Sequence, residues 1–268
     1  MIREPHFEPV RPAHAIERCA ASVIFGAPLP MDALAAVAQS QISGSSRLVA
    51  LPGNGLEVTV DTKTGKISLQ QVQNTFNYSL SGAVEPGLSL HPNIVVWQTD
   101  KYVRWTPFFG EIDAYLFPPI KKYLEHTNVS AVKLEYFDRF VWTGDFRDMK
   151  PSELLARDLG LVASAAIRPG QAWHSHCGWY EDLSNGGRRL VNANVDVVMN
   201  NDAQTPKPSI LIYTMMQDDS FDEPILNHSD IGARLNVLHQ ALKTLLSSIL
   251  SKDMARRISL TGGTPCQD

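Results

Sequence analysis

The most constraining feature of this sequence is a long amphipathic segment near its C-terminus. From residue 231 to residue 250, apolar residues recur at spacings of three and four, which is typical of a helix with one buried face. Ser229 or Asp230 is the predicted N-cap, and the helix is expected to end near Ser251. The stripe consists of Ile231, Leu235, Leu238, Leu242, Leu245, Leu246, Ile249 and Leu250. Such a helix needs a sheet or other helices to cover its apolar face.

Most of the chain before this helix consists of short segments typical of strands. In residues 131–142, apolar side chains alternate with charged ones, and Phe137 and Asp138 are expected to break the strict period of two. A hairpin turn at residues 184–187 is predicted between two of the later strands. The predicted strands are residues 17–26, 48–51, 56–60, 67–72, 78–81, 94–98, 102–105, 131–142, 173–182, 189–199 and 209–217.

Three further segments are predicted to be helical. Residues 31–42 form a short helix with one apolar stripe, and residues 151–159 form another that begins at a proline. Residues 109–126 have a broad apolar stripe, but Pro118 and Pro119 interrupt it. Because proline cannot make the helical hydrogen bond to the preceding turn, a kink or two helical pieces are expected there.

The order of these elements predicts an α+β fold in two tandem halves, each of order β-α-(β)3–4-α. In each half, a curved antiparallel sheet is expected to grip a long helix. The predicted organisation is an extended arm at residues 1–14, halves at residues 15–128 and 129–258 packed as one body, and a flexible tail at residues 259–268. The two halves share no convincing residue-level similarity, so the internal duplication is a hypothesis about topology alone.

Composition and cysteine usage exclude several classes of protein. A net charge of −4 and a pI near 6.1 differ from those of a strongly basic nucleic-acid-binding domain. Cys19, Cys177 and Cys266 are odd in number and widely spaced, which disfavours a disulfide framework and favours a reducing compartment. Neither a signal peptide nor an apolar run long enough to span a membrane is recognised in the sequence, so a cytoplasmic location is expected.

Four blocks of the chain resemble a sporadically distributed bacterial family of conserved hypothetical proteins of similar length. The features that carry the resemblance are Phe25 at a strand end, Trp105 with Phe108 at a helix start, residues 136–140 in a strand, and the Leu238-His239 pair. The blocks are residues 16–30, 99–112, 132–142 and 235–250.

Two features depart from the pattern of that family. Asp138 stands where the family usually has Asn, and Pro118 and Pro119 fall within the middle helix. The resemblance implies the fold and a bacterial origin. It implies no activity.

The sharpest local candidate for metal binding is the pair His174 and His176. On a strand, the two side chains point to the same face about 7 Å apart, a spacing that metal sites use. A third ligand would come from a neighbouring strand, with Asp196 preferred over Asn192 or Asn194. The favoured alternative is a polar, solvent-facing surface of the sheet, because two ligands do not make a zinc site. No cofactor is therefore expected.

Three residues are candidates for binding: Trp105, Arg139 and His239. His239 lies beside the apolar stripe of the last helix and is either an acid–base or ligand histidine, or a partly buried histidine bonded to strand backbone; the second is favoured. Arg139, with Glu135 and Asp138 on the same strand, either forms a structural ion pair or binds an anion, and the ion pair is favoured. Trp105 ends the strand predicted at residues 102–105, and the resemblance places it at the entry into the middle helix. No catalytic residue is assigned.

The function favoured by these observations is a non-enzymatic protein-interaction or scaffold module that acts through sheet edges and a concave sheet face. Its expected partner is another protein or a second copy of the chain. The alternative is a small-molecule or metal-binding enzyme that uses a groove near His174, His176 and His239. A weaker alternative is nucleic-acid binding by a saddle-shaped sheet, which the acidic pI disfavours.

Overall fold

A computed structural model of the chain describes residues 6–44, 47–51, 56–60, 67–71, 75–81, 83, 87–156, 160–162, 170–184, 186–200, 207–219, 225 and 227–260. Parts of five predicted segments lie outside these residues: residues 1–5 of the arm, residue 72 of the strand at 67–72, residues 157–159 of the short helix, residue 185 of the hairpin turn and residues 261–268 of the tail.

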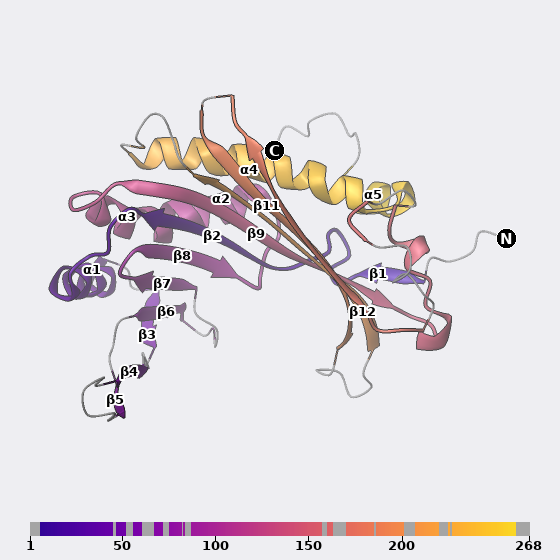
Figure 1. Ribbon diagram of the computed structural model, residues 1–268, viewed down its shortest axis with the longest axis horizontal. Coiled ribbons are helices and arrows are strands. Elements are labelled where there is room, and N and C mark those ends of the chain that lie inside the picture. Colours follow the sequence, from indigo (N-terminus) through magenta and orange to yellow (C-terminus); the bar gives the residue numbers. More distant parts are fainter. Residues whose placement is uncertain are drawn as a thin grey trace.

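The described part of the chain is built around one ten-stranded antiparallel sheet (Figure 1). From one edge to the other, the strand order is β10-β11-β12-β9-β2-β8-β7-β6-β3, and β1 also pairs with β9. The strands are β1 (Phe7–Pro9), β2 (Ile16–Phe25), β3 (Leu48–Leu51), β6 (Phe76–Leu80), β7 (Leu88–His91), β8 (Ile94–Thr99), β9 (Val129–Trp142), β10 (His174–Asp182), β11 (Arg188–Asn200) and β12 (Lys207–Asp219). A separate hairpin pairs β4 (Leu56–Val60) with β5 (Ile67–Gln71).

The predicted α+β class is confirmed, but the sheet is continuous where two separate sheets were expected. The joint is the antiparallel pairing of β2 with β9, which runs from Ile16 opposite Asp138 to Phe25 opposite Val129. The predicted arm also contributes to the sheet, because β1 continues along β9 beyond β2. The strand predicted at residues 102–105 does not form.

The helices cover one face of the sheet, which we call the inner face (Figure 1). Contacts fix this arrangement: the Tyr78 hydroxyl of β6 donates to the Ala38 carbonyl, and Trp97 of β8 stacks on Tyr115 with ring centroids 4.6 Å apart. The helical elements are α1 (Met31–Gly44), α2 (Trp105–Glu111), the π-helical η1 (Ile112–Leu116), α3 (Phe117–Tyr123), α4 (His228–Ile249) and α5 (Lys252–Arg257). None of the described helices is long and apolar enough to span a membrane.

The predicted middle helix is divided next to the prolines. The π-helical η1 lies directly before them, and Pro118 and Pro119 lie in the first turn of α3. Because proline lacks the N–H that would bond to the preceding turn, the change in helical geometry at η1 agrees with the expected interruption. In the region of the predicted helix at residues 151–159, the structure has a single 3₁₀ turn, η3 (Pro151–Glu153).

Burial alternates strictly along β9 from residue 132 to residue 142. The even-numbered residues face the helices and the odd-numbered residues face the opposite side, which we call the open face. The predicted break at Phe137 and Asp138 is therefore wrong: Phe137 keeps its place on the open face, and Asp138 is buried on the inner face.

The long helix α4 begins earlier than the sequence pattern indicated. Its N-cap is Asn227, whose side-chain oxygen accepts a hydrogen bond from the backbone N–H of Asp230 at 3.1 Å. The predicted caps, Ser229 and Asp230, lie inside the first turn. The apolar stripe faces the sheet as expected, and Leu235 and Leu238 are fully buried.

The cap assignment predicts the effect of two neighbouring substitutions. Asn227→Ala should lower the free energy of unfolding by about 1 kcal/mol, because the N–H of Asp230 loses its acceptor. Ser229→Ala is the matched control and should have little effect. Urea unfolding of both variants measures this. A larger loss for Ser229→Ala than for Asn227→Ala would contradict the assignment.

Candidate functional site

Two of the candidate binding residues, Trp105 and His239, lie in contact on the inner face. Their rings stack with centroids 4.2 Å apart and an interplanar angle of 4°. The Trp105 indole N–H donates to the side-chain oxygen of Asn236 at 2.7 Å, which ties the start of α2 to α4. Nδ1 of His239 is 2.9 Å from the hydroxyl oxygen of Tyr136 on β9, within hydrogen-bonding distance.

His239 has the properties of a structural histidine. Burial lowers its pKa to about 4, and the positive charge of Lys243 adds to the effect. At neutral pH the imidazole is therefore uncharged, with one donor and one acceptor nitrogen. The favoured alternative from the sequence predicted a bond to strand backbone, but the partner is the Tyr136 side chain. A pKa this low does not suit general acid–base chemistry near pH 7.

A chain of polar side chains continues from His239 into the core. The rings of Tyr136 and Tyr102 pack edge to face with centroids 5.9 Å apart, and burial raises the pKa of both phenols. Cys19 of β2 lies opposite Tyr136 in the sheet, and burial raises the pKa of its thiol. Asp138 adds negative charge to this group. We call these residues, Cys19, Tyr102, Tyr136, Asp138 and His239, the inner polar cluster.

Asp138 is the unusual member of the inner polar cluster. Its side chain is 1% exposed, and neither carboxyl oxygen has a hydrogen-bond partner among the described residues. Desolvation raises its pKa from 3.8 to about 7. Asp218, also buried on the inner face, differs because it accepts two hydrogen bonds from Arg189, at 2.6 and 3.0 Å. Asp138 therefore costs the fold free energy whenever it is ionised.

Sequence analysis missed this cluster, although one signal was present. Val132, Leu134 and Phe140 are apolar and even-numbered, so the alternation of the strand places Asp138 on the same buried face. The prediction treats Asp138 as a break in the pattern, whereas the structure has it as a polar group in a buried position. The contribution of Tyr102 and Cys19 depends on sheet pairing and was not visible in the chain order.

The histidine pair His174 and His176 lies on the open face at the edge of the sheet. The two rings are 5.2 Å apart, and Nε2 of His176 is 2.9 Å from the Asp196 carboxylate on β11. Asp196, the preferred third metal ligand in the sequence analysis, is thus a hydrogen-bond partner of His176. Within the described residues, no group of three or more His, Cys, Asp and Glu side chains is placed to hold a metal ion.

The structure does not bring the three candidate histidines together. His239 contacts Tyr136 on the inner face, whereas His174 and His176 project from the open face of β10. The sheet separates them, so no groove is lined by all three.

Arg139 lies on the open face and is fully engaged by neighbouring side chains. Its guanidinium donates to both carboxylate oxygens of Glu17 at 2.8 Å, and a third N–H donates to Ser209 at 3.1 Å. The same-strand carboxylates considered from the sequence are not its partners: Glu135 contacts Lys133 and Tyr213, and Asp138 faces inward. Arg139 forms a structural ion pair across β2 and β9.

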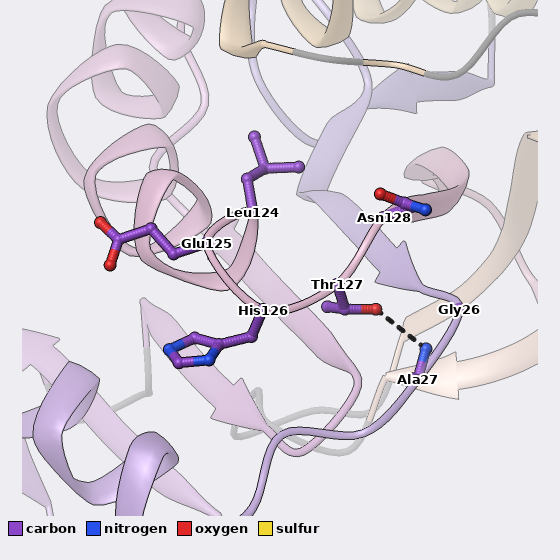
Figure 2. Close-up of a pocket in the computed structure, with 7 residues that line it drawn as sticks. All are labelled: Gly26, Ala27, Leu124, Glu125, His126, Thr127 and Asn128. Carbon is purple, nitrogen blue, oxygen red and sulfur yellow. Dashed lines mark hydrogen bonds between the residues drawn. The ribbon is translucent and has the colours of Figure 1, made fainter.

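A surface hollow of about 510 Å³ lies between the end of β2 and the turn that follows α3 (Figure 2). One wall is Gly26 and Ala27, and the backbone N–H of Ala27 donates to the Thr127 hydroxyl at 3.1 Å. The side chains of Glu125 and His126 extend away from this hydrogen bond (Figure 2). Since the walls are two loops with exposed side chains, the hollow gathers no convergent polar groups of the kind that fix a ligand.

The strand β10 forms a free edge of the sheet. Among the described residues, no strand pairs with its outer side. Opposite β11, the N–H of Val197 donates to the Trp173 carbonyl, and the N–H of Leu183 donates to the Gly187 carbonyl. Since Ser175 lies opposite Val195 and Cys177 opposite Ala193, these bonds assign the odd-numbered residues of β10 to the hydrogen-bonded pairing with β11.

The even-numbered residues therefore point their N–H and C=O groups outward, away from β11. Their side chains are exposed on the open face. They are His174, His176, Gly178, Tyr180 and Asp182. We call this row of backbone and side-chain groups the β10 edge.

Comparison with models of known protein families and with curated proteins finds no significant match to this chain. The resemblance to a bacterial family thus stays a prediction.

The buried carboxyl group of Asp138 predicts a pH dependence of stability. Because its pKa is raised in the folded state, the folded protein binds the proton more tightly, and stability should fall as the pH rises from about 4 to about 7. Asp138→Asn removes the ionisation, so the variant should be more stable than the native protein at pH 8, by up to about 4 kcal/mol.

Urea unfolding at several pH values tests this prediction, with the exposed Asp113→Asn as the control. The advantage of Asp138→Asn should vanish below about pH 4, where the native carboxyl is protonated in both states. Equal stability of the variant and the native protein at pH 8 would show that Asp138 carries no such cost.

Proposed function

We propose that this chain is a non-enzymatic protein-interaction module that accepts a partner strand along the β10 edge. The observation that supports the proposal is the edge itself, a nine-residue strand whose outer side has no neighbouring strand among the described residues. Its outward N–H and C=O groups recur at every second residue. This is the pattern that β-strand addition uses: the backbone supplies the affinity and alternate side chains supply the specificity.

The two edges of the sheet differ in a way that favours this use of β10. Natural sheets protect their edges with short strands, prolines, lysines or bulges, because an open edge pairs with other chains. The opposite edge strand, β3, has only four residues. β10 contains no proline or lysine, and its pairing with β11 has no register shift. The carboxylates of β10 are confined to its C-terminal end, at Glu181 and Asp182, and the rest of this edge is consistent with a surface that has a partner.

The open face beside the β10 edge provides side chains that a partner would contact. His176, Asn194 and Tyr213 lie in one row across β10, β11 and β12, and Phe137 follows on β9. The rings of Phe137 and Tyr213 are 4.7 Å apart, and Arg18 lies over Phe137 at 4.1 Å. The row combines aromatic, amide and imidazole groups, a mixture that suits contact with another protein.

The concave face expected from the sequence is replaced in this proposal by the open face and the edge. The helices pack on the inner face, so α4 occupies the position in which a partner was expected. We propose that the packing of α4 against the sheet has a structural role. Binding takes place on the side of the sheet that the helices leave uncovered.

The strand order is consistent with the proposed internal duplication. In each half, the first strand lies beside the last one, β2 beside β8 and β9 beside β12. Both halves also continue into helices on the inner face. We propose that two similar units joined through the pairing of β2 and β9, with a bacterial origin as the resemblance implies.

We also propose that the protein works in the cytoplasm. Cys19 is a buried free thiol and Cys177 a partly exposed one. Thiols in this state are compatible with a reducing compartment.

A proline at an outward-facing position tests the proposed function. Tyr180→Pro removes an N–H that points away from β11, so the pairing with β11 should persist while a partner strand loses one hydrogen bond. Tyr180→Ser is the matched control, because it removes the same ring and keeps the N–H. Both lose the contact of Tyr180 with Arg188.

The assay compares proteins captured from a cell extract by the tagged full chain and by both variants. A protein counts as a partner only if its recovery falls at least about ten-fold with Tyr180→Pro relative to Tyr180→Ser. Identical capture by the two variants, or no capture by a native chain that is also monomeric, would contradict binding at the β10 edge.

A further inference from the structure

We infer that the strand accepted at the β10 edge is β10 of a second copy of this chain, paired antiparallel about Gly178. The inference rests on the proposed function, because it names the partner of the same edge. It follows from the sequence of the edge and from the direction of its backbone groups.

The outward-facing residues are arranged symmetrically about Gly178. In an antiparallel pair centred there, His174 lies opposite Asp182 of the second copy, His176 opposite Tyr180, and Gly178 opposite itself. All of these residues point their N–H and C=O groups outward. Each opposed pair is therefore a hydrogen-bonded pair, and the register leaves no outward group of the strand without a partner.

The charge pattern of the strand favours the antiparallel direction. The histidines are at its N-terminal end, and Glu181 and Asp182 are at its C-terminal end. Antiparallel pairing places the imidazole of His174 beside the carboxylate of Asp182 on the other copy. Parallel pairing would place carboxylates beside carboxylates. An imidazole N–H can donate a hydrogen bond to a carboxylate, whereas two carboxylates opposite each other destabilise a strand pair.

Gly178 stands at the centre of the strand. The space that a Cβ would take there is filled by the Asn192 side-chain oxygen of the neighbouring strand β11, 2.5 Å from the Cβ position. The glycine is thus explained by packing within the chain. On the inner side of the same pair, Cys177 would lie opposite the half-buried Trp179 of the second copy, which adds an apolar contact beneath the hydrogen bonds.

Sedimentation analysis of the purified full chain tests the inference directly. A dimer is expected at micromolar concentration. Tyr180→Pro should raise its dissociation constant at least about ten-fold relative to Tyr180→Ser, because each copy loses a hydrogen bond at the interface. A native chain that stays monomeric at every accessible concentration would overturn the inference.

A disulfide cross-link tests the register without proline. In a background with Cys177 and Cys266 changed to serine, the double variant His176→Cys/Tyr180→Cys should form disulfide-linked dimers on oxidation. Opposed residues of a hydrogen-bonded pair have Cα atoms about 5.5 Å apart, within reach of a disulfide. The same two cysteines within one chain are about 13 Å apart and cannot pair.

The control is His174→Cys/Tyr180→Cys, in which the nearest cysteines of the two copies lie diagonally, about 7 to 8 Å apart. This variant should link poorly. Equal linkage of the two double variants would overturn the proposed register.

The results separate the inference from the proposed function. If the purified chain is monomeric but edge-dependent capture of another protein persists, the self-pairing is wrong and the interaction module remains. If both edge-dependent dimerisation and edge-dependent capture are absent, the two proposals fail together.

Discussion

The pairing of β2 with β9 is the interaction on which the rest of the structure depends. It joins the strands of both halves into one sheet, and β9 is also the partner of β12 and β1. The alternation of side chains along β9 therefore determines which side chains of its neighbouring strands face the helices. Residues opposite Leu134 face the helices, and residues opposite Glu135 face away from them. A shift of one residue in this register would exchange the two faces, because side chains alternate along a strand.

The two faces have different roles because only one is covered. The inner face buries the apolar stripes of the helices together with the inner polar cluster, whose member Asp138 lacks a partner among the described residues. The open face carries engaged side chains such as Arg139 with Glu17, and it ends at the β10 edge. Stability is thus concentrated on the helical side. We propose that recognition uses the other side and its edge.

Much of the local structure could be predicted from the sequence, since periodicity reports which side of each element is buried. The apolar stripe of α4 and the alternation of β9 are of this kind. The joining of β2 to β9 could not be predicted, because it is a contact between distant segments that no local pattern encodes. Asn227 was missed because Asn227, Ser229 and Asp230 are all suitable caps, and only backbone geometry selects among them. The contact of Trp105 with His239 could not be predicted either, because it depends on how α2 and α4 pack together, although each residue was a candidate by itself.

The central claim is that the outward backbone groups of β10 form a binding edge for another strand. Amide hydrogen exchange of the full chain, resolved by residue and measured over a range of protein concentrations, tests it most directly. The account predicts that the amides of His176, Gly178 and Tyr180 become protected as concentration rises. The amides of Ser175, Cys177 and Trp179, which face β11, should be protected throughout. Exchange at the outward amides that is fast and independent of concentration would contradict self-pairing at this edge.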